Sequence, residues 1–307
     1  MITELTAEQY SELDVNPAHC YNTVAFAELN SSKVERVHYL AWFIDGKLRV
    51  TLILGEDEAT LRSPFSAPFG GFDCVRHPSD EDVEMIFNDL RNYAADLNKT
   101  LSITLPPLFY SNELSSFLIR AVNTPWINVT ADYNYHYNTA IPPDFNLPTF
   151  KEIRKKLRRA NSAGFQFQLV IEEHKKREVY EVIRRNRESQ GYPLSMTFGQ
   201  IMSTEAIVRM DFFMMYDEAR HPVASAICYH VAPGIVQVIY WGDLVDYRPL
   251  YPMNLFAMRV FAHYHEAGIK IVDVGPSSTG GIPNRGLCTF KHRIGCELTS
   301  KYTLTIG

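Results

Sequence analysis

The sequence has few cysteines, and their spacing matches no common cysteine motif. The five are Cys20, Cys74, Cys228, Cys288 and Cys296, an odd number that includes no Cys-x-x-Cys pair. A disulfide framework needs cysteines in pairs, and a zinc ribbon needs them closely spaced. The spacing therefore argues against both classes and predicts five reduced, mostly buried thiols.

Long apolar runs and several catalytic motifs are also missing. No stretch approaches the roughly 20 apolar residues that a membrane-spanning helix needs. Residues 1–9 have neither the basic start nor the apolar core of a secretion signal. A Gly-x-Gly-x-x-Gly after a strand, a Walker loop, Gly-x-Ser-x-Gly and His-Glu-x-x-His are all absent. These absences predict a cytoplasmic protein with no membrane span and no metal site.

Composition and charge point to a folded protein with one basic segment. The chain has 307 residues, 46% of them hydrophobic and 21% charged, which is typical of a globular protein of two domains. The net charge is -5, yet residues 151–191 hold 12 basic and 6 acidic side chains. This asymmetry favours an anionic partner near the middle of the chain over a general nucleic-acid coat.

The N-terminal half carries signals for a hairpin and for helix starts. Asp45-Gly46 between two apolar runs predicts a hairpin of strands 37–44 and 47–54. Ser79 followed by three acidic residues predicts the start of a helix, with apolar residues at helical spacing as far as Leu97. We also expect a helix at 23–29, strands at 59–63 and 101–105, and a Pro- and Gly-rich loop at 64–72.

The second half repeats this order. Strands are predicted at 210–216, 223–231, 235–241 and 269–274, with a helix from Pro252 to Gly268 before the last one. In both halves, about 34 residues separate the hairpin turn from the start of the helix before the short strand. We therefore expect an α+β protein of two domains, 1–145 and 146–307, each a mixed, mostly antiparallel sheet flanked by helices. Two unrelated mixed domains are the alternative.

An aromatic strand at 133–137 and two basic helices are expected between these regions. Thr149 and Glu152 form a capping-box pattern that predicts a helix through Ala163, ended by Gly164. A second basic helix is predicted at 175–190. The first helix has a narrow apolar stripe and six basic residues: Lys151, Arg154, Lys155, Lys156, Arg158 and Arg159.

Two charged residues stand beside apolar sequence. Lys291 lies one helical turn from Leu287 in a short helix predicted at 284–295, so its ammonium could enter a cleft or extend into water. Asp273 lies inside an apolar strand, where a carboxylate must find hydrogen-bond donors or shift its pKa. It is therefore a candidate base or a structural anchor.

Four segments resemble the Fem-type branch of the GNAT acyltransferase superfamily. The best motif is Phe290-Lys-x-x-x-Gly295, preceded by Gly286-Leu. The resemblance covers most of residues 150–307 and implies two tandem GNAT-like domains, in agreement with the repeated unit. The other segments are the basic run Phe150–Phe165, Tyr240-Trp-Gly-Asp243 with Tyr247-Arg-Pro-Leu-Tyr-Pro252, and Asp273-Val-Gly275.

The resemblance implies an N-acyltransferase or aminoacyltransferase that moves an acyl group to an amine, usually on a cell-wall or other envelope precursor. The donor would be acyl-CoA or aminoacyl-tRNA, and the partners would be the precursor and tRNA. Lys291 corresponds to the lysine of the terminal motif, which lies in the transfer site. The basic run ending at Gly164 corresponds to the Arg/Lys-rich helix at the start of the second domain.

Such a reaction needs a neutral amine, a polarised carbonyl and a protonated leaving group. We expect Asp273 or Asp243 to accept the amine proton and Lys291 to stabilise negative charge. Three tyrosines are candidate proton donors: Tyr240, Tyr247 and Tyr302. The residues expected to bind substrate are Trp241, Tyr247, Arg248, Asn254, Arg154 and Arg158.

Two departures from the family pattern bear on the donor. No long helical-hairpin insertion is visible at 150–210, so the tRNA-gripping arm of some Fem ligases is missing. The loop 243–253 lacks the Gln/Arg-x-x-Gly-x-Gly/Ala with which ordinary GNAT enzymes hold the CoA pyrophosphate. A non-catalytic GNAT-like protein that binds an anionic precursor is therefore the alternative function.

The donor is expected in the second domain, near Arg248–Asn254. The helix at Pro252 has no acid in its first turn, whereas the helix after Ser79 begins with three acids that would repel a phosphate. The first domain would then mainly shape the acceptor site. The competing location for the donor is the loop at Gly70-Gly71, where glycine allows close backbone approach.

Overall fold

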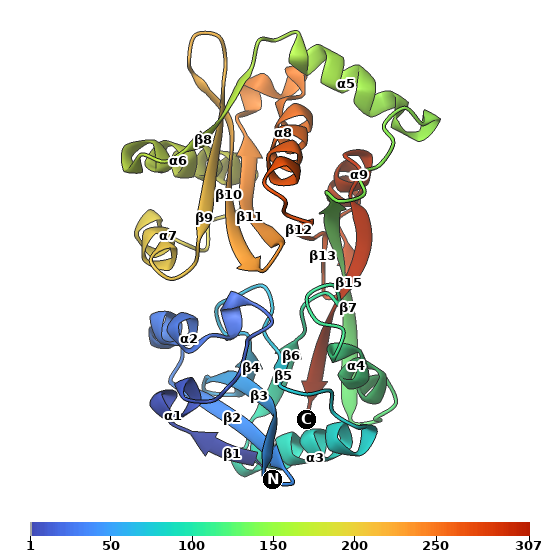
Figure 1. Ribbon diagram of the computed structural model, residues 1–307. Coiled ribbons are helices and arrows are strands. Elements are labelled where there is room, and N and C mark those ends of the chain that lie inside the picture. The colour runs from blue at the N-terminus through green and yellow to red at the C-terminus, as the bar shows by residue number, and fades with distance from the viewer. Residues whose placement is uncertain (1) are drawn as a thin grey trace. The chain divides into compact units, whose positions relative to one another are not determined.

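The computed structural model describes residues 2–307 and forms two compact units (Figure 1). Each unit is a mixed, mostly antiparallel sheet flanked by helices, which confirms the predicted fold class. Unit 1 contains the chain up to Tyr133 with Ser278–Ile282 and Ser300–Gly307, and unit 2 contains Asn134–Ser277 and Pro283–Thr299.

Two strands carry the chain from one unit to the other. The chain leaves unit 1 within β7 (Ile127–Asn138), belongs to it again over Ser278–Ile282, and returns to it finally within β15 (Glu297–Ile306). The expected boundary at residue 145 comes after the strand that makes the crossing, and the expected domains omit the return. The sequence carries no strong signal for β15, whose side chains are only partly buried along most of its length.

Unit 1 has the strand order β1-β2-β3-β4-β6-β15, with β5 also paired to β3. The pair β4 and β6 is parallel, and five pairs are antiparallel: β1 with β2, β2 with β3, β3 with β4, β3 with β5, and β6 with β15. Its further elements are β1 (Ile2–Leu5), α1 (Ala7–Ser11), η1 (Cys20–Asn22), α2 (Val24–Asn30), η2 (Ser31–Lys33), β2 (Arg36–Ile44), β3 (Lys47–Glu56), β4 (Thr60–Ser63), β5 (Phe72–Cys74), α3 (Asp80–Asp96), β6 (Thr100–Thr104) and α4 (Leu114–Val122).

Unit 2 has the strand order β7-β12-β11-β10-β9-β8, in which the pair β11 and β12 is parallel. A short hairpin of β13 (Ser278–Thr279) and β14 (Ile282–Pro283) follows β12. The further elements are η3 (Pro148–Phe150), α5 (Lys151–Asn161), β8 (Gln166–Val170), α6 (Glu173–Ser189), α7 (Phe198–Glu205), β9 (Met210–Tyr216), β10 (Pro222–Ala232), β11 (Ile235–Asp243), η4 (Val245–Leu250), α8 (Pro252–Glu266), β12 (Ile271–Pro276) and α9 (Arg285–Arg293).

The two units repeat one order of elements. It is a strand, two helices, a hairpin, a fourth strand, a helix, a strand parallel to that fourth strand, a helix and a last strand. In the first copy these are β1, α1, α2, β2, β3, β4, α3, β6, α4 and β7; in the second they are β8, α6, α7, β9, β10, β11, α8, β12, α9 and β15. The last strand of each copy, β7 or β15, begins in the unit of its own copy and ends in the other unit. The predicted repeated unit is therefore confirmed.

One strand differs between the copies. In unit 2, β11 follows β10 with only small register shifts. In unit 1 the corresponding position beside β3 is divided between two short strands. β4 pairs with the end of β3, and after a loop the chain returns as β5 and pairs with the middle of β3. The predicted loop at 64–72 fills this interruption as far as Gly71, and Phe72 begins β5.

Two local sequence signals are confirmed and one is wrong. Asp45 and Gly46 form the hairpin turn with φ values of 51° and 69°, and Ser79 forms a capping box with Asp82. The capping box expected at Thr149 does not form. Thr149 lies inside the 3-10 turn η3, so Phe150 becomes the residue before α5 and offers no capping side chain.

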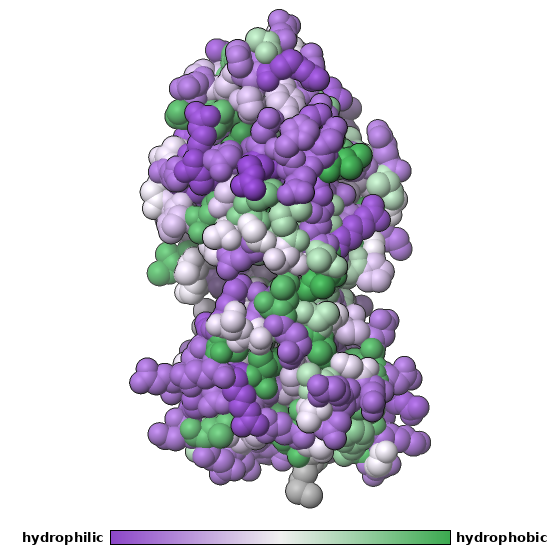
Figure 2. Space-filling model, turned by 90° about the vertical axis from the view of Figure 1, so that its left-hand side faces the viewer, coloured by the Kyte–Doolittle hydropathy of each residue, from purple (hydrophilic) through white to green (hydrophobic). Residues whose placement is uncertain are grey.

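Alternate residues of the unit 1 hairpin face different helices. Leu40 and Leu52 are completely buried in a cluster with residues of α3 and α4, whereas Tyr39 and Ile53 pack with Tyr10 of α1 and with α2. Because successive strand residues point to opposite faces, helices cover both sides of this hairpin. In unit 2, α6 packs on β10 and β11, and Figure 2 shows its side of the molecule as largely hydrophilic.

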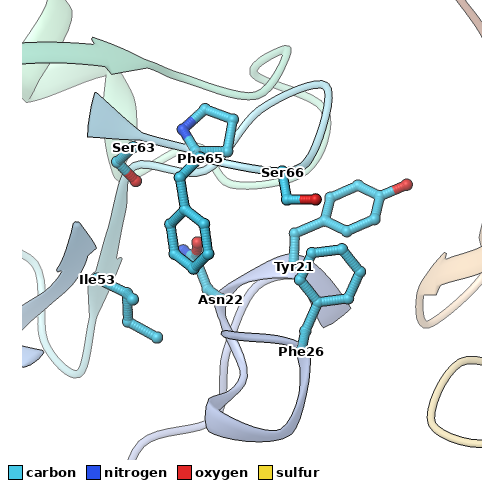
Figure 3. Close-up of a pocket in the computed structure, with 8 residues that line it drawn as sticks. Tyr21, Asn22, Phe26, Ile53, Ser63, Phe65 and Ser66 are labelled. Carbon is cyan, nitrogen blue, oxygen red and sulfur yellow. The ribbon is translucent and has the colours of Figure 1, made fainter. Parts of the chain in front are cut away.

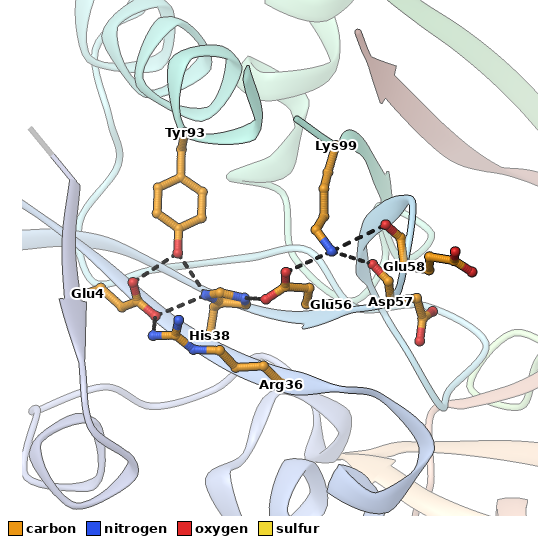
Figure 4. A network of polar contacts seen from close by, with 8 residues as sticks. All are labelled: Glu4, Arg36, His38, Glu56, Asp57, Glu58, Tyr93 and Lys99. Atoms are coloured by element: carbon orange, nitrogen blue, oxygen red, sulfur yellow. Dashed lines mark hydrogen bonds and ion pairs between the residues drawn. The ribbon is translucent and has the colours of Figure 1, made fainter. Parts of the chain in front are cut away.

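A buried polar network fastens β1 to the unit 1 sheet (Figure 4). The completely buried ring of His38 lies between two carboxylates, 2.9 Å from Glu4 Oε1 and 2.8 Å from Glu56 Oε2. The Tyr93 hydroxyl donates to Glu4, and Lys99 pairs with Glu56 at 2.7 Å. Each buried charge thus has a partner of opposite sign or a hydrogen bond, as burial requires.

Asp73 on β5 is a buried acid of unit 1 that pairs with no cation among residues 2–307. The residue is 3% exposed, and its carboxylate accepts a hydrogen bond from the Ala18 amide at 2.9 Å. Burial raises its pKa to about 7, although the bonds from Ala18 and Asn22 oppose that shift. The folded protein therefore holds a proton on Asp73 that the unfolded chain releases at lower pH.

The stability of the protein should fall as the pH rises from about 4 to about 7 because the raised pKa of Asp73 favours the protonated folded state below that range. Asp73→Asn cannot ionise, so it should lack this dependence and be more stable than the parent at pH 7, by up to roughly 4 kcal/mol. Urea unfolding of both proteins across this range measures the difference. Parallel pH profiles would show that Asp73 titrates normally.

Candidate functional site

Most of the predicted site residues of unit 2 lie at or near the carboxyl ends of β11 and β12. These parallel strands pair only over Ile235–Gln237 and Ile271–Asp273, and each then continues without the other. Ligands of open sheets with parallel strands bind outside the carboxyl ends of those strands. This end of unit 2 is therefore the place to look for a site.

Asp273 occupies the last position of the parallel pairing and is fully bonded. Its side chain accepts hydrogen bonds from Asn134 Nδ2 at 2.9 Å and Gln237 Nε2 at 2.7 Å, and from the Gly275 amide at 2.9 Å. The residue is completely buried. Three donors on one buried carboxylate favour the structural anchor over the base, the two roles that the sequence left open.

Lys291 points inward from α9 onto the end of β12. Its ammonium donates to the carbonyl oxygens of Gly275 at 2.8 Å and Pro276 at 2.9 Å, and lies 5.7 Å from the centre of the Tyr135 ring. Only 2% of the residue is exposed, and burial lowers its pKa to about 8. The lysine therefore does not extend into water, and its charge is held by backbone carbonyls.

Lys291→Met tests how the buried charge acts. The pKa of Lys291 is lower in the folded than in the unfolded protein, so its contribution to stability rises between about pH 8 and pH 10.5. The parent should gain stability relative to Lys291→Met over this range, by roughly 3 kcal/mol at most. Paired thermal or urea unfolding at several pH values measures the difference. A constant difference would show that the ammonium is solvated in the folded protein.

Asp243 ends β11 and is held by two neighbours. Its Oδ1 accepts from Arg248 Nε at 3.1 Å, and Asn186 Nδ2 donates to its backbone carbonyl at 2.7 Å. Burial raises the pKa of the carboxyl, against the opposing effect of Arg248. A β-carbon on Gly242 would lie 2.4 Å from Asn186, so α6 can approach this strand end only because residue 242 is glycine.

The aromatic site residues are spread along the same strand end. Tyr240 is 8% exposed, and its hydroxyl lies 2.6 Å from Ser195 Oγ. Trp241 packs edge-on against Phe290 of α9. Tyr247 lies in η4 and donates to Asp217 at 2.8 Å, so its hydroxyl is already engaged away from Asp243.

The N-terminus of α8 has no side-chain cap and no acid in its first turn. Tyr251 precedes it in the left-handed region, with φ 57°, and Pro252 and Asn254 follow in the first turn. Two cations of α5 lie over the Tyr251 ring: Lys156 Nζ is 5.1 Å and Arg159 Cζ 5.8 Å from the ring centre. An uncapped helix start, whose dipole is positive, and two cations thus meet here, which favours an anion.

The other cations of α5 do not join this group. Arg154 donates to the carbonyl oxygens of Phe145 and Leu147, so it ties down the segment before the helix. Arg158 is exposed. Neither has a described contact with the start of α8, and of the six basic residues only Lys156 and Arg159 contact Tyr251.

The backbone amides of Gly70 and Gly71, in the loop of unit 1, already donate hydrogen bonds within the protein. The Gly70 amide donates to the Thr104 carbonyl, and the Gly71 amide donates to Ser63 Oγ at 3.0 Å. A β-carbon on Gly70 would lie 2.5 Å from Ser63 Oγ. Figure 3 shows Ser63 and Asn22 beside the small pocket at this loop. The glycines therefore serve internal packing, and their amides are not free for a phosphate.

Sequence reasoning missed the side chains that hold the strand ends. Gln237 and Asn134 donate to Asp273, and Asn186 holds Asp243. One signal was present for Asn186, because it continues the helical spacing of the buried residues Val179 and Ile183 while being polar. No comparable pattern marks Gln237. Tyr302, one of the three candidate proton donors, lies on β15 in unit 1, where its backbone carbonyl accepts a hydrogen bond from the Leu105 amide.

Residues 2–307 contain neither a membrane-spanning helix nor a cluster of metal-ligating side chains. No helix of this range is long and apolar enough to cross a membrane. No group of three or more His, Cys, Asp or Glu side chains in the same range is placed to hold a metal ion.

Known proteins resemble the chain in fold although no family model and no curated protein matches its sequence. FemX superposes with a TM-score of 0.68 at 10% identity, over 99% of this chain and 96% of FemX. L-PGS from Bacillus licheniformis has a TM-score of 0.59 at 10% identity, over 97% and 90%. A tandem GNAT protein from the clavulanic acid biosynthesis pathway has a TM-score of 0.53 at 12% identity, over 99% and 97%. The chain therefore has the fold of FemX and of the tandem GNAT protein, with two GNAT-like domains.

Proposed function

We propose that the protein is an N-acyltransferase or aminoacyltransferase whose phosphate-bearing donor binds at the N-terminus of α8. The observation that carries the proposal is the meeting of this uncapped helix start with Lys156 and Arg159 at the Tyr251 ring. The fold likeness to FemX and to a tandem GNAT protein supports a transferase. The acceptor is an amine, for which a cell-envelope precursor is the candidate.

The residues present fit a diphosphate or a nucleic-acid phosphate. In the first turn of α8, Pro252 has no N–H and the Asn254 amide donates to the Tyr251 carbonyl, so the Met253 amide is the backbone donor offered to a ligand. The Arg248 side chain, from η4, is 40% exposed. The Gly70-Gly71 amides of unit 1, by contrast, already donate within the protein. This contrast supports the expected placement of the donor in the second domain. In this proposal, Lys156 and Arg159 bind the phosphate by charge, in place of the Gly-rich loop that the sequence lacks.

The chemistry assigns different roles to the two aspartates. The amine attacks the acyl carbon and a base takes the amine proton, while the bond to the thiol sulfur or ribose oxygen breaks and that leaving atom takes up a proton, which gives an amide and a free thiol or hydroxyl. Asp243 is the proposed base because it is still 11% exposed at its side chain and its raised pKa matches that task. Asp273, with three donors and no exposure, orders the strand end instead. Lys291 fixes the backbone of Gly275 and Pro276 beside it.

Removing the two cations at the Tyr251 ring should weaken donor binding. We expect Lys156→Gln with Arg159→Gln to lower the affinity for CoA or for an aminoacyl-adenosine phosphate mimic by at least about tenfold, because charged hydrogen bonds to phosphate are lost. The matched control is Lys151→Gln with Lys155→Gln, which removes the same charge from the exposed face of α5. Calorimetry measures both. Equal losses in the two variants would refute a specific phosphate site at α8.

Asp243→Asn should remove the pH dependence of transfer. Because burial raises the pKa of Asp243, the rate of the parent protein should rise with pH as the carboxyl ionises. The variant should lose at least about a hundredfold in kcat/KM and this rising limb, while donor affinity is kept. The measurement is product formation across pH with a panel of acyl donors and amine acceptors. An unchanged profile would remove Asp243 from the mechanism.

A non-catalytic binding protein is the second candidate. The near-complete burial of Lys291 and the saturation of Asp273 favour it, because neither group is free to meet a substrate. The same panel separates the two functions. Donor binding at α8 without any product across the panel would support the binding protein.

A further inference from the structure

The cations of α5 divide by helical position into groups with different partners. Ile153, Leu157 and Ala160 repeat at i, i+4 and i+7 and pack into the core of unit 2. Lys151, Lys155 and Arg158 repeat with the same spacing and are exposed. At about 100° per residue, this second stripe points about 160° away from the first. We call these three residues the outer stripe.

The outer stripe has no partner in the described chain. None of its three side chains forms an ion pair or hydrogen bond with another of residues 2–307, and α5 contributes one acidic residue, Glu152. The second basic helix is different. On α6, Lys175 pairs with Glu172, Lys176 with Glu205, and Arg184 with two glutamates, Glu181 and Glu188.

The repulsion within the outer stripe is therefore not balanced inside the protein. Like charges four residues apart on a helix destabilise it by a few tenths of a kcal/mol per pair. The stripe also lies on the opposite side of the helix from its packed face, while Lys156 and Arg159 contact Tyr251. An anionic partner of the stripe is thus separate from the donor proposed at α8.

Exposed aliphatic side chains precede the stripe. Ile141 is 73% exposed and Leu147 is 50% exposed, in the segment that leads into α5. Arg154 of α5 donates to the Leu147 carbonyl, which holds that segment against the helix. A nucleic-acid backbone offers no partner for aliphatic groups, whereas a bilayer interface takes both cations and aliphatic side chains.

We propose that the outer stripe, with Ile141 and Leu147, binds the surface of anionic phospholipid bilayers. The cations contact lipid phosphates, and the two aliphatic side chains enter the boundary below them. Each cation near an anionic surface contributes about fivefold in affinity, so three contribute on the order of 100-fold. Binding of this size is reversible and weakens with added salt.

The test uses the full chain and cosedimentation with vesicles of phosphatidylcholine, with and without phosphatidylglycerol. We expect binding to the anionic vesicles at physiological salt and on the order of 100-fold weaker binding for Lys151→Gln with Lys155→Gln and Arg158→Gln. The control, Lys47→Gln with Arg76→Gln and Arg185→Gln, removes three exposed cations elsewhere and should bind as the parent does. Circular dichroism checks that each variant is folded.

A second variant separates a bilayer from a nucleic acid. Ile141→Ser with Leu147→Ser should weaken vesicle binding at every salt concentration and leave its salt dependence unchanged. Equal loss in the stripe and control variants, or no difference between the two kinds of vesicle, would overturn the proposal. So would an RNA hairpin that displaces the vesicles and binds through the stripe independently of Ile141 and Leu147. Loss of CoA binding in the Lys156 and Arg159 variant has no bearing on this result.

Discussion

The end of the parallel pairing between β11 and β12 depends on one buried carboxylate. Asp273 joins β7, β11 and β12, because it accepts from Asn134, Gln237 and the Gly275 amide at the point where the parallel pairing ends. The bond to Gly275 shapes the strand end whose carbonyls hold Lys291. An unbonded carboxylate here would cost several kcal/mol, so the three donors are a requirement of the fold before they are a feature of any reaction.

The two copies of the repeated unit differ in structure at the corresponding strand end. In unit 1 the strand beside β3 is interrupted, and the loop that leaves it fills the space with Gly70 and Gly71, whose amides are used internally. In unit 2 the strand is continuous and leads through η4 to an uncapped helix start at Pro252. The copies share an order of elements, but in the second the cations Lys156 and Arg159 lie beside an uncapped helix start.

The basic residues in the middle of the chain make different kinds of contact. On α6 most cations with described partners are paired with glutamates of the same unit. On α5 the helical position decides whether a cation contacts Tyr251, holds the preceding segment or faces outward. A count of basic residues does not distinguish the two helices, because it shows neither the position of each residue around the helix nor the group that the residue contacts.

The sequence by itself determined the repeated α+β unit, the Asp45-Gly46 turn and the helix start at Ser79, since each depends on residues close together in the chain. It also placed Lys291 beside an apolar stripe and limited Asp273 to two roles. Only the tertiary structure shows which groups bind Asp273, because the donor Asn134 lies 139 residues from it. The return of β15 to unit 1 depends likewise on distant pairing, such as Thr303 with Thr104. Contacts between residues far apart in the chain leave no local periodicity, so only the folded structure reveals them.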